Sequence, residues 1–80
     1  MVVKTEVGRK AREAARKRMR MLRGLREYYL GDMTIGLLSE KLGIPLRALI
    51  DSMQKYGLPY KSSEEDRKIG LEKVNELLER

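Results

Sequence analysis

The sequence predicts an all-α protein, namely a helix-turn-helix with a long basic N-terminal helix and a C-terminal amphipathic helix. Apolar residues recur at helical spacing in several segments of the chain, and both prolines fall between these segments. The length of 80 residues indicates one small, marginally stable domain, and the absence of cysteine excludes disulfides. We therefore expect a homodimer, because oligomerisation is the remaining source of stability.

Three parts follow from this pattern. Residues 1–21 form a basic N-terminal arm and the start of the first helix, residues 22–61 form the helix-turn-helix core, and residues 62–80 form the C-terminal helix. Residues 2–7 are rich in β-branched side chains and are interpreted either as a short strand or as a frayed end.

The positive charge is concentrated near the N-terminus. Residues 1–30 carry ten Lys/Arg and three Glu, a balance of +7, whereas residues 31–80 carry eight Lys/Arg and nine Asp/Glu, a balance of −1. This asymmetry is typical of nucleic-acid binders. The scarcity of Gln and Asn beside 30 charged residues is typical of a thermophile. With no long apolar run and no signal peptide, we expect a cytoplasmic protein without membrane contact.

The first helix is predicted from Gly8 to Leu30, and it carries five arginines within about 80° of one face. These candidate phosphate-binding residues are Arg9, Arg12, Arg16, Arg20 and Arg23. The guanidinium group binds phosphate bidentately, and like charges at this spacing repel one another, so we interpret the row as a DNA contact. The alternative is a solvated face with salt bridges to Glu6, Glu13 and Glu27. The apolar face is Ala-rich before residue 20, so residues 8–20 are expected to project as an arm or to be covered by a second copy.

The helix-turn-helix is predicted over residues 34–56. We expect Thr34 to be the N-cap, Gly43 to close the first helix in the left-handed conformation, and Pro45 to take the first position of the second helix. The candidates for base contact on the second helix are Arg47, Gln54 and Lys55. Asp51 lies among them and repels phosphate, so a face that only packs or binds protein is the alternative.

The C-terminal helix is predicted from about residue 64 to 79, with Ser62 and Glu65 as a capping box. Its apolar stripe is narrow, which indicates docking on a partner, and its members are the dimerisation candidates Leu71, Val74, Leu77 and Leu78. A separate acidic row consists of Glu65, Glu72, Glu76 and Glu79. We interpret this row either as solvated or as facing the arginine row of a second copy.

Residues 22–60, LRGLREYYLGDMTIGLLSEKLGIPLRALIDSMQKYGLPY, carry a Tyr-Leu-Gly start at Tyr29, a small-residue helix ending in Leu42-Gly43-Ile44, and a Gly57-Leu58-Pro59 end. This segment resembles a family of small prokaryotic helix-turn-helix proteins, of archaeal and cyanobacterial type. These are proposed to be antitoxins and are often encoded beside PIN-domain ribonuclease toxins. The resemblance implies autoregulatory DNA binding and a toxin partner.

The predicted function is double-stranded DNA binding with sequence preference, as a transcriptional regulator or an autoregulating antitoxin. The alternatives are a protein-interaction module that neutralises a toxin and a protein that binds structured RNA. Without His or Cys the serines have no activating base, so we expect no enzyme activity, no cofactor, no metal and no small-molecule substrate.

Overall fold

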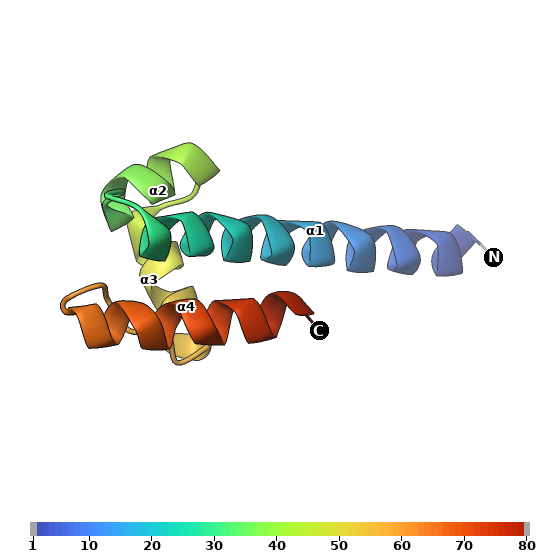
Figure 1. The fold of residues 1–80 in the computed structure, drawn as a ribbon. Helices are drawn as coiled ribbons and strands as arrows, with labels where there is room; N and C mark the ends of the chain where they lie inside the picture. The colour runs from blue at the N-terminus through green and yellow to red at the C-terminus, as the bar shows by residue number, and fades with distance from the viewer. Residues whose placement is uncertain (1, 80) are drawn as a thin grey trace.

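The computed structural model describes the backbone of residues 2–79 and the side chains of residues 8–79. Four helices follow one another: α1 (Val2–Leu30), α2 (Ile35–Leu42), α3 (Leu46–Lys55) and α4 (Glu64–Glu79) (Figure 1). The described residues contain no strand, so the all-α class is confirmed and the strand considered for residues 2–7 is wrong. Within the described range, none of the helices combines the length and apolar character needed to cross a bilayer.

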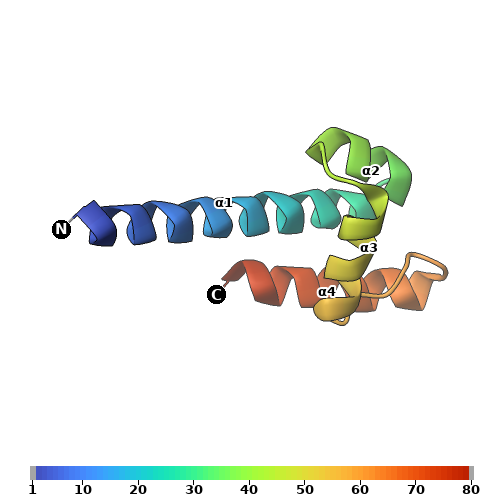
Figure 2. The ribbon, with the colours of Figure 1, turned by 180° about the vertical axis from the view of Figure 1, so that it is seen from behind.

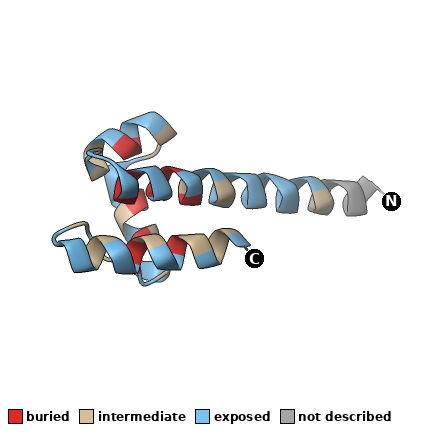
Figure 3. Ribbon diagram, in the orientation of Figure 1, coloured by how far each residue is buried: buried red, intermediate tan, exposed pale blue. Residues whose placement is uncertain are grey.

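The helices gather around the C-terminal half of α1. Helix α4 runs antiparallel beside it, α2 lies on the other side, and α3 crosses both long helices (Figures 1 and 2). Buried residues are confined to this end of the molecule, whereas every side chain from residue 9 to residue 18 is exposed (Figure 3). The N-terminal half of α1 therefore projects from the folded body, and the longest dimension of the molecule is 51 Å.

Close packing of α4 on α1 depends on a glycine. Gly70 is buried, and a Cβ atom at this position would overlap the ring of Tyr29. Tyr29 is fully buried, and its hydroxyl donates a hydrogen bond of 2.6 Å to the carbonyl of Pro59. Burial, followed by the neighbouring Tyr28, raises the pKa of the Tyr29 hydroxyl above its ordinary range. The ring and the glycine thus fix how closely the two long helices approach.

The apolar stripe of α4 packs within the chain. Val74 has no exposed surface, and Leu71, Leu77 and Leu78 are partly buried against the same core. The stripe was expected to dock on a second copy, but α1 of the same chain covers it. Its residues form part of the domain core. The homodimer stays a prediction, and this stripe no longer supports it.

The turns follow the predicted chemistry with two shifts of register. Thr34 caps α2 by accepting a hydrogen bond of 3.1 Å from the Leu37 amide, and Gly43 has a φ of +69°. Pro45 has extended backbone angles and lies at the N-cap of α3 instead of at its first helical position. Ser63, not Ser62, caps α4 (Glu64–Glu79), because its Oγ accepts the hydrogen bond from the Asp66 amide.

Lys61 fastens the loop before α4 to the end of α1. Its Nζ donates to the carbonyls of Tyr28, Gly31 and Met33 at 2.8, 2.5 and 3.2 Å. The ammonium also lies 4.7 Å from the centre of the Tyr28 ring, and the Tyr28 hydroxyl accepts from the Lys61 amide. A cation at this position stabilises the negative end of the helix.

Candidate nucleic-acid interface

The five predicted phosphate-binding arginines are all exposed along one face of α1. We call them the Arg stripe: Arg9, Arg12, Arg16, Arg20 and Arg23. Gly70 of α4 lies against Tyr29 of α1, and the two helices are antiparallel. Nine residues towards the C-terminus of α4 and nine towards the N-terminus of α1, Glu79 is therefore level with Arg20. Most of the stripe consequently lies on the part of α1 that extends beyond the end of α4.

No acid of the described side chains neutralises the Arg stripe. Residues 8–79 contain two ion pairs, Lys41 with Glu27 and Arg67 with Glu64. Glu27, one of the acids considered as a partner for the stripe, is therefore occupied by α2, and Glu13 makes no ion pair. The side chain of Glu6, the third acid considered, lies outside the described residues. The alternative interpretation was a solvated face held by salt bridges to three acids. Two of them, Glu13 and Glu27, form no ion pair with the Arg stripe.

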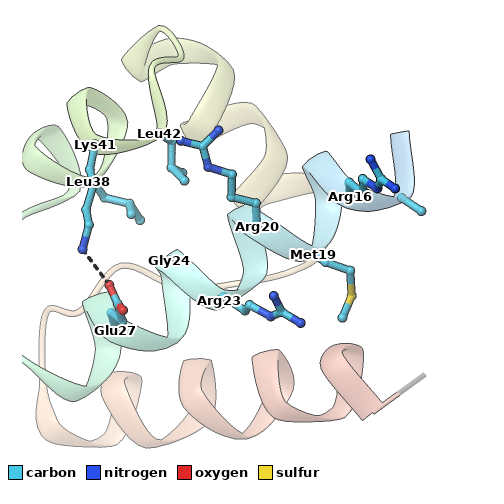
Figure 4. Close-up of a pocket in the computed structure, with 10 residues that line it drawn as sticks. Arg16, Met19, Arg20, Arg23, Gly24, Glu27, Leu38, Lys41 and Leu42 are labelled. Carbon is cyan, nitrogen blue, oxygen red and sulfur yellow. Dashed lines mark hydrogen bonds and ion pairs between the residues drawn. The ribbon is translucent and has the colours of Figure 1, made fainter. Parts of the chain in front are cut away.

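A groove of about 610 Å³ runs between α1 and α2, beside the stripe (Figure 4). Apolar residues of both helices line it, and so do four cationic side chains: Arg16, Arg20 and Arg23 of α1 and Lys41 of α2. The helices come close here because Gly24 has no side chain, since a Cβ atom would lie 2.8 Å from Leu38 Cδ1. Helix α2 thus adds a fourth cation to the groove, and this cation is paired with Glu27 of α1.

The contribution of Lys41 was not predicted from the sequence. Lys41 and Glu27 are 3.0 Å apart in space, but they belong to different helices. Periodicity within one helix reveals a row of arginines, whereas it carries no information on which neighbouring helix lies beside that row. Only the packing of α2 over Gly24 brings this lysine to the groove.

The candidates for base contact lie on the exposed face of α3. Arg47, Gln54 and Lys55 are exposed, and so is Asp51 between them, whereas Leu49 is fully buried. Asp51 makes no ion pair with Arg47 within the described part of the chain. The face of α3 is accordingly polar, accessible and of mixed charge.

The Arg stripe and the exposed face of α3 point in opposite directions. At about 100° per residue, the stripe lies on the side of α1 opposite Leu22, Leu25 and Tyr29, which are buried. Helix α3 crosses on the buried side, and its own buried residues, Leu49 and Met53, belong to the same core. One rigid copy therefore cannot place both surfaces on the same face of one straight duplex.

Perturbed ionisable groups lie away from this surface. Apart from Tyr29, the hydrogen bond from Arg67 lowers the pKa of the Glu64 carboxyl on the first turn of α4. Among the described residues, no group of three or more Cys, Asp or Glu side chains is arranged to hold a metal ion.

Comparison with known proteins adds no relative to this description. No family model, no curated protein and no solved structure matches the chain. The resemblance of residues 22–60 to proposed antitoxins therefore stays a prediction.

Proposed function

We propose that this protein binds double-stranded DNA, with the Arg stripe of α1 as its main phosphate contact. The observation that carries the proposal is a row of five exposed arginines without an acid partner among the described side chains. Like charges spaced three and four residues apart destabilise a helix. A row of this kind gains most from an external polyanion, and guanidinium groups suit phosphate oxygens.

The dimensions of the row suit a duplex. Arg9 and Arg23 are 14 residues apart, which corresponds to about 21 Å along an α-helix. B-DNA carries one phosphate charge per ~1.7 Å of its axis, so about twelve phosphates lie within that length. The five guanidinium groups meet an excess of acceptors, and the resulting affinity depends little on base sequence.

We further propose that α2, the Gly43 turn and α3 act as a helix-turn-helix and provide the sequence preference. Arg47, Gln54 and Lys55 are then the side chains that reach base edges in the major groove. Because this face is turned away from the Arg stripe, it contacts a different segment of DNA. The affinity and the sequence preference thus belong to separate surfaces of one copy.

A protein-binding role is the second candidate, and one observation favours it. Asp51 is exposed at the centre of the α3 face, where an unpaired carboxylate repels phosphate. On this reading α3 binds a protein, such as the toxin that the family resemblance implies, and DNA binding is secondary.

The salt dependence of binding to a 20-base-pair duplex tests the proposal. Removing one phosphate contact by Arg16→Ala should make the slope of log K against log salt shallower by about one unit, and by about two in a symmetric dimer. Lys17→Ala is the matched control, because it removes the same charge from the adjacent position outside the stripe. Identical slopes for the two variants would refute the phosphate-binding role.

Two further variants address α3. Arg47→Ala or Gln54→Ala should weaken binding to a preferred site by about 1–3 kcal/mol and to random DNA much less. Equal losses on every sequence would make this face a phosphate contact that reads no bases, and no loss would favour a protein partner for it. A structured RNA that competes better than the duplex would replace DNA by RNA in the proposal.

A further inference from the structure

A second charged row, of opposite sign, runs along α4. Its four members are exposed on the side turned away from α1, and we call them the Glu row: Glu65, Glu72, Glu76 and Glu79. Neither the Arg stripe nor the Glu row takes part in the two ion pairs of residues 8–79. We infer that the Glu row of one copy docks antiparallel along the Arg stripe of a second copy.

The spacing of the two rows supports this register. Counted from Arg23 towards the N-terminus, further arginines lie 7, 11 and 14 residues away, and counted from Glu65 towards the C-terminus, further glutamates lie 7, 11 and 14 residues away. Since both segments are α-helical, matching intervals keep their members level over about 21 Å. The level pairs are Arg23 with Glu65, Arg16 with Glu72, Arg12 with Glu76 and Arg9 with Glu79. At about 100° per residue the first two pairs face each other directly, whereas the last two are level across the width of the rows, where the long arginine side chain spans the distance.

The proposed register also brings two residues of like charge to the same level, but the helix geometry keeps them apart. Arg20 is level with Lys68, but at about 100° per residue the two lie on opposite edges of their rows. The residue on the same edge as Arg20 is Ile69, which is 39 % exposed. This edge is turned towards α2, where Leu42 lines the groove. An exposed apolar side chain thus approaches the apolar wall of the groove.

The docking joins copies head to tail. Gly70 and Val74 mark the side of α4 that packs on α1, and the Glu row lies opposite them. The Arg stripe likewise lies on the side of α1 opposite the core, so the two rows of one copy point away from each other. A contact between different surfaces of two copies is heterologous and leaves one free row at each end. The assembly therefore grows with concentration and does not stop at a dimer.

This docking and DNA binding use the same arginines, a link that rests on the proposed function. Ion pairs between exposed groups are individually weak and are screened by salt. We therefore expect self-association in free protein at low ionic strength and its displacement by duplex DNA. The docking itself is tested without DNA, so its failure and the failure of the proposed function are distinguishable.

The experiment measures mass by sedimentation equilibrium at about 25 mM and about 500 mM salt, which change the screening length several-fold. Wild type should exceed 9.3 kDa increasingly with concentration at low salt and return towards 9.3 kDa at high salt. Glu72→Lys with Glu76→Lys, and separately Arg12→Glu with Arg16→Glu, should each be monomeric at both salts. The control Lys10→Glu with Lys17→Glu matches the second variant in charge but lies off the stripe, and it should still associate.

Mixing the two monomeric variants provides the decisive arm. One variant retains an intact Arg stripe and the other an intact Glu row, and the reversed charges at positions 72 and 76 of the first are level with those at 16 and 12 of the second. Both contacts are complementary again in an equimolar mixture, which should therefore associate head to tail at low salt and exceed 9.3 kDa increasingly with concentration. Circular dichroism checks that each variant keeps its helix content. Wild type that stays monomeric at low salt would overturn the inference. So would a dimer that survives both row variants, or a mixture that stays at 9.3 kDa.

Discussion

Gly70→Ala should destabilise the protein, although alanine is the better helix former. In a helix interior the exchange of glycine for alanine gains about 1 kcal/mol. At this position the new Cβ atom would overlap Cε1 and Cζ of the Tyr29 ring. Tyr29 has no exposed surface, and its hydroxyl is held by the Pro59 carbonyl, so the ring has no free space to enter.

The magnitude follows from two opposing contributions. Overpacking a core costs about 1–3 kcal/mol, and a displaced ring also loses a hydrogen bond worth about 1 kcal/mol. After the helix-propensity gain, we expect a net loss of roughly 1–3 kcal/mol. For a domain of this size, that loss corresponds to a fall in melting temperature on the order of 10 °C.

Thermal unfolding followed by circular dichroism measures this effect, with Gly36→Ala as the matched control. Nothing lies within 4 Å of a Cβ atom at Gly36 in α2, so this change should stabilise by about 0.5 kcal/mol. In a Tyr29→Leu background the ring is gone, and Gly70→Ala should become neutral or stabilising. If Gly70→Ala stabilises wild type as much as Gly36→Ala does, the packing of α4 on α1 described above is wrong.

Two further predictions concern the turn and the buried tyrosine. Gly43→Val should cost about 1–2 kcal/mol or more, because Gly43 has a φ of +69° and β-branched residues avoid that region. Denaturant unfolding should show a smaller loss for Gly43→Asn, and equal losses would contradict the conformational cause. The raised pKa of Tyr29 means that its hydroxyl ionises in the unfolded chain before it does in the folded protein. Its stabilising contribution is thus complete below pH ~10 and declines above it, by up to about 1.4 kcal/mol per pH unit. Alkaline denaturation of Tyr29→Phe should lack this component, and a parallel pH profile for wild type and variant would exclude it.

The helices and their turns were predictable because their causes are local. Apolar spacing marked all four helices, and Gly43 before Ile44-Pro45 marked the left-handed turn. The capping prediction erred by one residue, since Ser62 and Ser63 are adjacent and chemically equivalent. Which serine accepts the Asp66 amide depends on where the preceding loop places the first turn.

The packing of the helices was not predictable, because it depends on residues far apart in sequence. Nothing in the α4 pattern distinguishes Gly70 until Tyr29 is placed over it. Lys61 had no local reason to bind the carbonyls at the end of α1. The apolar residues of α4 were consequently expected to pack on a second copy, although α1 of the same chain covers them.

The same division holds for the candidate site. Periodicity along one helix revealed the Arg stripe, since its members share a face by spacing alone. The orientation of the Arg stripe relative to α3 depends on how three helices cross. The periodicity within any one helix carries no information on these crossings. The exposed candidates Arg47 and Gln54 were therefore identified correctly as surface residues of one helix, while their opposition to the stripe emerged only from the structure.

The most direct test of the central claim compares duplex binding by wild type and by a variant with all five residues of the Arg stripe replaced by alanine. Each phosphate contact contributes about 0.9 to the salt slope, so the slope should become shallower by about four to five units. Affinity at ~100 mM salt should fall by at least about two orders of magnitude. A control variant replaces four cations of the same helix outside the stripe: Lys10, Lys17, Arg18 and Arg26. The control should lose far less affinity than the stripe variant. Equal binding of wild type and the stripe variant would contradict the claim and would place the protein-binding role first.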